Sequence, residues 1–410
     1  MRDPLTLRIT RLGSQGDGVA ETSSGPLFVP FTLAGEVVKA TIAAERTRLV
    51  SVESPSPDRV APICRHFGTC GGCALQHMRP EAYRAWKREQ VIAAFNARGI
   101  EANVGALITA NGKRRRATFS AVKTATGIAL GFHEAGTHDL IDIAECPVLE
   151  PQIFAAIPGI KALILPLMSG TNEMRISVTR TDGGLDVAID ATKKSLTPDV
   201  RAQLAKAAAA AKISRVSIAG DPAYESDAPF LRFGLAEVVP PPAAFLQAVA
   251  DAEAQMTGLI LAAVGKVKSV ADLFSGAGAF TFPMAAKAKV LAADSDKGAI
   301  AALIAASKKT QGLKPIQGLV RDLFREPLSA LELNEHEAIV FDPPRAGAEA
   351  QARMIAKSKV KTVVAVSCNP ATLARDARIL IDGGYKLESI TPIDQFHFTP
   401  HVEAVAVFRK

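Results

Sequence analysis

Three short motifs near the C-terminus carry side chains suited to covalent chemistry: Asp342-Pro-Pro-Arg345, Ser367-Cys368-Asn369-Pro370 and His401-Val402-Glu403. The first two each follow an apolar run typical of a buried strand, at residues 338–341 and 362–366. In an open parallel sheet, ligands bind just beyond the carboxyl ends of the strands. We therefore expect a thiol and two carboxyl groups to meet in one crevice, which predicts an enzyme with a nucleophile and a base.

The chain has five cysteines, and four of them have the spacing of a metal site. Cys64, Cys70 and Cys73 lie within ten residues, Cys146 stands apart, and Cys368 is left for chemistry. In a reducing compartment such a pattern favours a metal over disulfides. Four sulfur ligands suit zinc or an iron–sulfur cluster, and the spacing does not choose between them. Buried apolar cysteines are the plainer alternative.

Length and charge limit the class of protein. With 410 residues, 48% of them hydrophobic, the chain predicts a globular protein of two or three domains. It contains no apolar run of membrane-spanning length, and the first residues lack the apolar stretch of a signal peptide, so we expect a cytoplasmic protein without a membrane partner.

Up to Lys123 there are 18 Lys and Arg against 10 Asp and Glu, and beyond it 30 against 31. The basic N-terminal third favours a nucleic-acid partner over ordinary solvated charge.

The order of patterns predicts three regions. Residues 4 to about 55 alternate like short strands separated by glycines, which indicates a small β-domain. Residues 80–98 have helical periodicity, and the run Lys113–Arg116 is suited to binding phosphates or is a solvated loop. Alternating segments from 174 to about 239 indicate a mixed sheet. After Pro240-Pro-Pro242, β and α patterns alternate to the end, which predicts a doubly wound α/β domain.

A second crevice is predicted where a strand at 268–272 runs into a glycine-rich turn with Gly276 and Gly278. Such a turn before a helix lets the backbone close around a ligand. The next two strands lead to Asp294, placed for ribose hydroxyls, and to Asp322, placed for an adenine amino group. Acids at successive strand ends fit S-adenosylmethionine, although each of these two could instead cap a helix.

Taken together, these motifs resemble the bacterial RNA uridine-C5-methyltransferases. The chain is most similar to the branch that carries a TRAM domain and an iron–sulfur cluster and modifies 23S ribosomal RNA. The resemblance covers the chain from Leu5 to Phe408 and rests on the four N-terminal-half cysteines, the three C-terminal motifs and the TRAM-like stretches Gly16–Ala20 and Leu33–Val38. Ser275 stands where the family usually has cysteine, and Ala279 where it often has a polar residue.

The resemblance implies a role for each site residue. Cys368 is expected to be the nucleophile, Glu403 the base that removes a proton, and Arg345 a substrate-positioning residue. A 4Fe-4S cluster rather than zinc is implied for Cys64, Cys70, Cys73 and Cys146. The expected contacts of S-adenosyl-L-methionine are Gln247, Phe274, Gly276, Gly278, Asp294, Asp322 and Asp342.

The expected fold class is α/β, with a Rossmann-like methyltransferase domain at 241–410, an OB-like TRAM β-barrel at 1–55 and a central mixed α+β domain at 56–240 that holds the cysteines. The expected activity is methylation of uracil C5 in RNA by a monomer, with 23S rRNA favoured over tRNA. Three other functions remain open: a cytosine-C5 methyltransferase, an amino-group methyltransferase, and an iron–sulfur RNA-binding protein without catalysis. The amino-group enzyme would need no nucleophilic cysteine.

Overall fold

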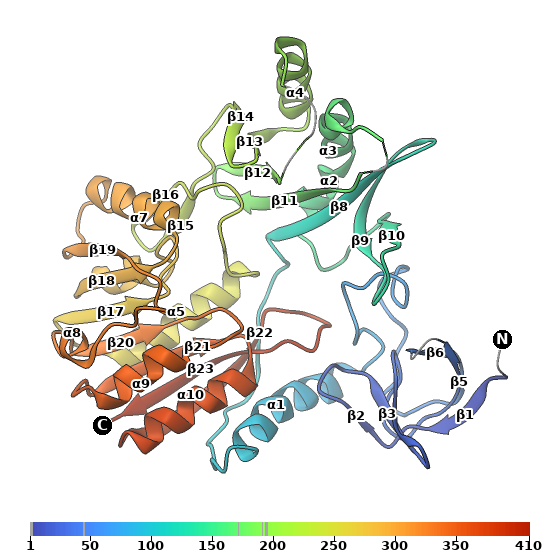
Figure 1. Ribbon diagram of the computed structural model, residues 1–410, viewed down its shortest axis with the longest axis horizontal. Coiled ribbons are helices and arrows are strands. Elements are labelled where there is room, and N and C mark those ends of the chain that lie inside the picture. Colours follow the sequence, from blue (N-terminus) through green and yellow to red (C-terminus); the bar gives the residue numbers. More distant parts are fainter. Residues whose placement is uncertain (1–2, 44–45, 171, 191, 193–195) are drawn as a thin grey trace. The chain divides into compact units, whose positions relative to one another are not determined.

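The computed structural model describes residues 3–43, 46–170, 172–190, 192 and 196–410 (Figure 1). Met1 and Arg2, which entered the signal-peptide prediction, lie outside these ranges. The chain divides into two compact units. Unit 1 contains Met1–Gln90, Gly131–Pro147 and Phe396–His401, and unit 2 contains the remaining residues. Within the described ranges, no helix has both the length and the apolar character needed to cross a membrane.

The N-terminal strands of unit 1 confirm the predicted small β-domain. They form two three-stranded sheets around a core that includes Ile9, Val29 and Val38. Gly18 is required there, because a Cβ atom at this position would lie 2.0 Å from the Thr32 hydroxyl oxygen. The strands are β1 (Leu5–Arg8), β5 (Val37–Ala43) and β6 (Arg46–Ser54) in one sheet, and β2 (Arg11–Leu12), β3 (Gly18–Thr22) and β4 (Gly25–Val29) in the other.

The predicted helix at 80–98 is α1 (Pro80–Asn96), whose first part belongs to unit 1 and whose end belongs to unit 2. Tyr83, Val91 and Phe95 are buried as the periodicity predicts. Lys87 carries a side chain that normally lies on a helix surface, yet it is fully buried. Its ammonium group donates a hydrogen bond to the Phe396 carbonyl (3.1 Å) and lies over the Tyr83 ring, which supplies the partners that a buried charge needs.

The central region contains the predicted mixed sheet, with strand order β10-β9-β8-β11-β12-β13-β14. β10 and β9, β8 and β11, β11 and β12, and β13 and β14 pair antiparallel, whereas β12 and β13 are parallel. The strands are β8 (Arg116–Thr124), β9 (Gly127–His133), β10 (Leu140–Asp142), β11 (Met174–Thr181), β12 (Gly184–Ile189), β13 (Ile213–Ile218) and β14 (Asp221–Glu225). The helices are α2 (Pro151–Ala155), α3 (Ile157–Ile164), the 3-10 helix η1 (Leu165–Leu167) and α4 (Pro198–Ala210), and a hairpin of β15 (Leu231–Phe233) and β16 (Ala236–Val238) follows.

An eight-stranded sheet forms the core of the C-terminal region, with order β19-β18-β17-β20-β21-β23-β22-β7. β17 to β21 are parallel, and β23 is antiparallel to both of its neighbours. The strands are β7 (Ile108–Thr109), β17 (Ser269–Leu273), β18 (Lys289–Asp294), β19 (Ile316–Val320), β20 (Ala338–Phe341), β21 (Thr362–Ser367), β22 (Lys386–Asp394) and β23 (Glu403–Arg409). The helices are α5 (Ala250–Val264), α6 (Thr281–Ala285), α7 (Lys297–Lys309), α8 (Ala330–Leu333), α9 (Glu349–Lys357) and α10 (Pro370–Asp382).

Both faces of this sheet are covered, as its apolar strands require. Alternate residues of β17, β20 and β21 point to opposite faces: one set packs with α9 and α10, the other with α5. Figure 1 shows α9 and α10 side by side along the sheet. Chain order reverses between β17 and β20, which is the switch point where ligands bind in open α/β sheets. The predicted fold class is confirmed.

Candidate active site

The predicted cofactor turn follows β17 and has an unusual backbone. Phe274, Gly276 and Gly278 all have positive φ, at 61°, 51° and 98°. The N–H of Gly276 donates to Oδ2 of Asp294 (2.8 Å), so that β17 and β18 are tied together at their ends. A Cβ at Gly276 would meet nothing within 4 Å, whereas at Gly278 it would lie 2.8 Å from the Phe282 ring. The turn thus leaves room on one side of Gly276 for a bound group, as a cofactor cradle requires.

The other acids of this half of the sheet have local partners. Asp322 accepts the N–H of Phe324 (3.0 Å) in a turn, so its side chain already caps backbone groups. Asp294 does not cap α7, because the N-cap is Asp296. Asp272 is buried and accepts the Thr281 hydroxyl hydrogen. Burial, with smaller contributions from Asp342 and Asp294, raises the pKa of Asp272 to about 7.

The three predicted reactive groups lie at neighbouring strand ends. Asp342 directly follows β20, Cys368 follows β21, and Glu403 opens β23, which pairs with β21. Burial raises the pKa of Glu403 to about 7. Burial and the nearby Glu403 raise the pKa of Asp342 well above its ordinary value. The site therefore holds one carboxyl group, Glu403, with a pKa in the range suited to general acid–base chemistry near neutral pH, beside a second one whose pKa is also raised.

The thiol of Cys368 differs from expectation. A nucleophilic cysteine is expected to form its thiolate readily near neutral pH, but burial together with Glu403 and Asp342 raises the pKa of the Cys368 thiol to about 11. Arg345 acts in the opposite direction and lowers the pKa. In the protein alone, the thiol is consequently protonated at neutral pH and must lose its proton during the reaction.

Gln247 lies among these carboxyl groups. Its Nε2 donates to Oδ2 of Asp342 (2.8 Å), and its Oε1 accepts from Nε2 of Gln395 (2.7 Å). The same Gln395 nitrogen also donates to Oε2 of Glu403 (2.7 Å). Our sequence reading missed Gln395, although its place directly after a strand was a usable signal.

Arg115 corrects the prediction that the run 113–116 binds phosphates or is a solvated loop. The residue is 7% exposed, and its side chain pairs with Glu253 (2.5 Å) and donates to the Gln247 carbonyl (3.0 Å). Arg115 therefore fixes the backbone that carries Gln247. Arg116 is half-buried, and its guanidinium lies 4.8 Å from the centre of the exposed Phe245 ring.

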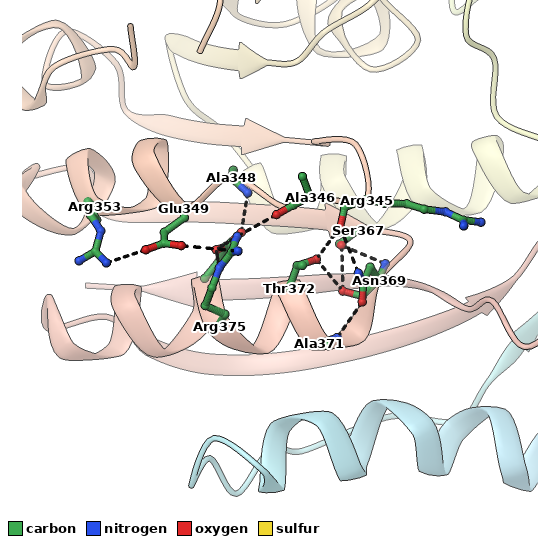
Figure 2. A network of polar contacts seen from close by, with 11 residues as sticks. Arg345, Ala346, Ala348, Glu349, Arg353, Ser367, Asn369, Ala371, Thr372 and Arg375 are labelled. Carbon is green, nitrogen blue, oxygen red and sulfur yellow. Dashed lines mark hydrogen bonds and ion pairs between the residues drawn. The ribbon is translucent and has the colours of Figure 1, made fainter. Parts of the chain in front are cut away.

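A polar network joins the loops that carry Asp342 and Cys368 (Figure 2). The Asn369 side chain caps α10 through the N–H of Ala371 and donates its own N–H to the Arg345 carbonyl (3.0 Å). Arg375 donates to the Ala346 carbonyl (3.0 Å). The Arg345 side chain itself points away from this network in Figure 2, which leaves its charge for other partners.

The four remaining cysteines are half-buried and lie in loops of unit 1. The loop of Cys64 is tied to that of Cys146 by Arg65, whose N–H and guanidinium both bind Glu145. At the other end of the first loop, Cys70 forms a β-bridge with Glu134. The donor chemistry suits an iron–sulfur cluster. In the described part of the chain, however, no group of three or more His, Cys, Asp or Glu side chains is arranged to hold a metal ion.

Known proteins resemble this chain in sequence and in fold. Residues 240–410 match the family model of tRNA (Uracil-5-)-methyltransferase, and residues 3–56 match the TRAM domain. A protein of Brucella suis named "Uncharacterized RNA methyltransferase" is 47% identical over 405 residues, which cover 98% of this chain and 97% of that one. The 23S rRNA (uracil(1939)-C(5))-methyltransferase RlmD of Erwinia tasmaniensis is 30% identical over 438 residues, covering 100% of this chain and 97% of its own.

Among solved structures, the tRNA (uracil-54, C5)-methyltransferase of Pyrococcus abyssi, in complex with S-adenosyl-L-homocysteine, matches with a TM-score of 0.74. The match covers 98% of this chain and 99% of that one at 23% identity, and so it supports the fold. The full-length relatives, with a sheet that brings Asp342, Cys368 and Glu403 to neighbouring strand ends, lead to one conclusion: the chain belongs to the RNA uracil-C5 methyltransferase family.

Proposed function

We propose that this protein methylates carbon 5 of uracil in RNA, with S-adenosylmethionine as methyl donor and a covalent bond between Cys368 and carbon 6. The observation that carries the proposal is the placement of Asp342, Cys368 and Glu403 at neighbouring strand ends. Carbon 5 of uracil is a weak nucleophile, and addition of sulfur at carbon 6 converts the ring into an enolate with electron density on carbon 5.

Cys368 releases its proton to solvent as its sulfur bonds to carbon 6, and it takes a proton back from solvent when it is expelled at the end of the reaction. Arg345 favours the release of this proton because it lowers the pKa of the thiol. Bound S-adenosylmethionine supplies an electrophilic methyl group. Once carbon 5 carries both methyl and hydrogen, Glu403 takes that hydrogen as a proton. The released electron pair restores the double bond between carbons 5 and 6 and expels Cys368. A carboxyl group with a pKa of about 7 suits this task near neutral pH.

We propose that the cofactor lies over the turn after β17. The open space at Gly276 and the tie between Gly276 and Asp294 support this placement. Asp294 would bind the ribose and Asp322 the adenine amino group. The proposed contacts also include Gln247, Phe274, Gly278 and Asp342.

We propose 23S rRNA as the substrate, with tRNA as the alternative. Support for 23S rRNA is the full-length similarity to the Erwinia tasmaniensis enzyme together with the TRAM domain. The target uridine would leave its base stack to reach the crevice, because a stacked base is inaccessible. A non-catalytic RNA-binding protein is a further alternative that an activity assay excludes or supports.

The test is methyl transfer by the purified full-length protein, from S-adenosylmethionine labelled with tritium in its methyl group, to transcripts of 23S rRNA and of tRNA. We expect label in 23S rRNA that is recovered as 5-methyluridine after digestion. The Glu403→Gln variant should accumulate a covalent RNA–protein adduct on a denaturing gel, and Cys368→Ala should form none. Label in cytidine or in an amino group would contradict the proposal. Transfer to tRNA alone would show that tRNA, and not 23S rRNA, is the substrate.

We further propose a 4Fe-4S cluster on Cys64, Cys70, Cys73 and Cys146 with a structural role. The four thiols and the ties between their loops support it. Protein purified without oxygen should contain iron and sulfide and should absorb visible light, as iron–sulfur clusters do. Cys73→Ser should lose them, while the matched control Cys368→Ala should keep them. Bound zinc without sulfide would contradict the cluster, and normal folding and RNA binding by iron-free protein would contradict its structural role.

The three-domain division at about 55 and 240 is also a proposal, with RNA binding by the first two regions and chemistry in the third. Limited proteolysis of the intact protein should cut first near Pro55–Pro57 and Pro240–Pro242. We expect a monomer by sedimentation and recovery in the cytoplasmic fraction of cells.

A further inference from the structure

A chain of hydrogen bonds runs through the proposed site and starts from a backbone group. The N–H of Ala248 donates to Oε1 of Gln395 (2.8 Å). Gln395 then donates from Nε2 to Gln247 (2.7 Å) and to Glu403 (2.7 Å), and Gln247 donates to Asp342 (2.8 Å). Gln395 is 0% exposed, and these three contacts use its carbonyl oxygen and both of its amide hydrogens.

The backbone start of this chain fixes its direction. A backbone N–H can only donate, so the Gln395 atom facing Ala248 must be the oxygen, and its nitrogen must face Gln247 and Glu403. Gln247 must then present its oxygen to Gln395 and its nitrogen to Asp342. Arg115 anchors the same backbone segment, because it donates to the Gln247 carbonyl and its own N–H bonds to the Ala248 carbonyl (2.9 Å). The backbone N–H of Ala248 thus determines the orientation of both glutamine amides and the direction of each hydrogen bond in the chain.

The consequence falls on the two oxygens of Glu403. Oε2 accepts from Gln395 and is held as an acceptor. Oε1 is buried and has no hydrogen-bond partner among the described residues. A buried carboxyl oxygen without a partner is costly unless a ligand uses it.

We propose that Gln395 is a positioning residue for the base: it binds Oε2 of Glu403 and leaves Oε1 as the atom that takes the proton from carbon 5 of uracil. This inference rests on the proposed function and deepens it. Gln395 touches neither substrate nor cofactor in this scheme and acts through Glu403.

The charges around Glu403 make this donor important. Asp342 after β20 and the Cys368 thiol after β21 face it and disfavour its ionisation when they are charged, whereas Arg345 beside Cys368 is the nearby cation. Asp394 is buried one residue before Gln395. Burial raises the pKa of Glu403, and the hydrogen bond from Gln395 lowers it. Without this donor, Glu403 should hold its proton to higher pH.

The test uses Gln395→Met, which keeps the length of the side chain and removes the donor, and Gln395→Glu, which keeps the acceptor for Ala248 and adds a carboxyl group beside Glu403. The control is Gln351→Met, since Gln351 is also 0% exposed and its side chain bonds the backbone of Leu328, which lies outside the proposed site. The readout is tritium release from RNA transcripts carrying 5-tritiated uridine, measured from pH 5.5 to 9. Rates are expressed per site that binds S-adenosylhomocysteine, so that partial unfolding cancels.

We expect the pH midpoint of tritium release to rise by about one unit in Gln395→Met and by more in Gln395→Glu. Release at pH 7 should fall roughly five-fold in Gln395→Met and recover by about pH 9. Gln351→Met should lose stability without moving the midpoint. Unchanged midpoints in both Gln395 variants would overturn the inference while leaving the proposed function intact. No tritium release by the unaltered protein would instead overturn the proposed function.

Discussion

The two halves of the catalytic sheet use the same residue type in different ways. Beyond β17 to β19, Asp294 and Asp322 accept backbone N–H groups of adjoining turns. Beyond β20 to β23, Asp342 and Glu403 are bound by the amide side chains of Gln247 and Gln395, and burial raises their pKa values. The position of a carboxyl group at a strand end therefore does not by itself decide whether it is bound by a turn or has a raised pKa.

The difference teaches how one sheet can place turn-bound carboxyl groups at one half and carboxyl groups with raised pKa values at the other. Backbone N–H donors favour the charged form of a carboxyl group, which suits hydrogen bonds to a ligand's hydroxyl or amino groups. Burial disfavours the charged form and lets a carboxyl group exchange protons near neutral pH. The boundary lies at the switch point between β17 and β20. Substitutions on the two sides should have separable effects.

The largest effect should come from exchanging charge for amide on each side of this boundary. Asp294→Asn should weaken S-adenosylhomocysteine binding by at least roughly ten-fold, because it removes the carboxylate from the cradle. Glu403→Gln should leave that affinity within about two-fold and slow turnover by roughly 10²–10⁴-fold. Calorimetric titration and single-turnover methyl transfer measure the two quantities. If both variants lost affinity equally, the two halves would not be separate.

Asp272 should reveal the cost of a buried acid in protein stability. Its pKa is raised to about 7, so the folded protein keeps a proton that the unfolded chain releases near pH 4. The destabilisation is absent below about pH 4, grows as pH rises and is complete above about pH 7. Asp272→Asn removes this destabilisation. The free energy of unfolding that the variant gains over the unaltered protein should therefore grow from pH 5 to pH 8, where it reaches about 4 kcal/mol. Urea midpoints at both pH values measure this gain, and a constant difference would contradict the pKa assignment.

The loop tie in Figure 2 should give a smaller effect and can be divided into its parts. Asn369→Asp keeps the cap on α10 and removes the N–H that binds the Arg345 carbonyl. We expect about a ten-fold slower methyl transfer with little change in melting temperature, because the loops that carry Asp342 and Cys368 are no longer held in a fixed position relative to each other. Asn369→Ala also loses the cap, which costs about 1 kcal/mol of stability. Full activity in Asn369→Asp would show that the tie is structural only.

Sequence patterns predicted the strands closely where packing leaves a simple signature. Ala338–Phe341 matches β20, because a strand buried on both faces is a continuous apolar run that ends where proline begins. The same patterns could not distinguish the buried Asp272 from the turn-capping Asp322, since both follow or close an apolar strand. They also could not show that Arg115 pairs with Glu253, 138 residues away, or that Gln395 bonds to Ala248, 147 residues away. Such contacts depend on the assembled fold.

The mildest change tests the cofactor half through two neighbouring glycines. Gly276→Ala places a methyl group in open space at φ 51°, so it should cost only about 1 kcal/mol of stability yet reduce S-adenosylhomocysteine affinity, because the methyl group enters the cradle. Gly278→Ala is the comparison on the packed side of the same turn: its methyl group would lie 2.8 Å from Phe282 and should lower the melting temperature more. Melting curves with and without S-adenosylhomocysteine separate the two effects. If Gly276→Ala bound the ligand as tightly as the unaltered protein, the open side of this turn would not be where the cofactor lies.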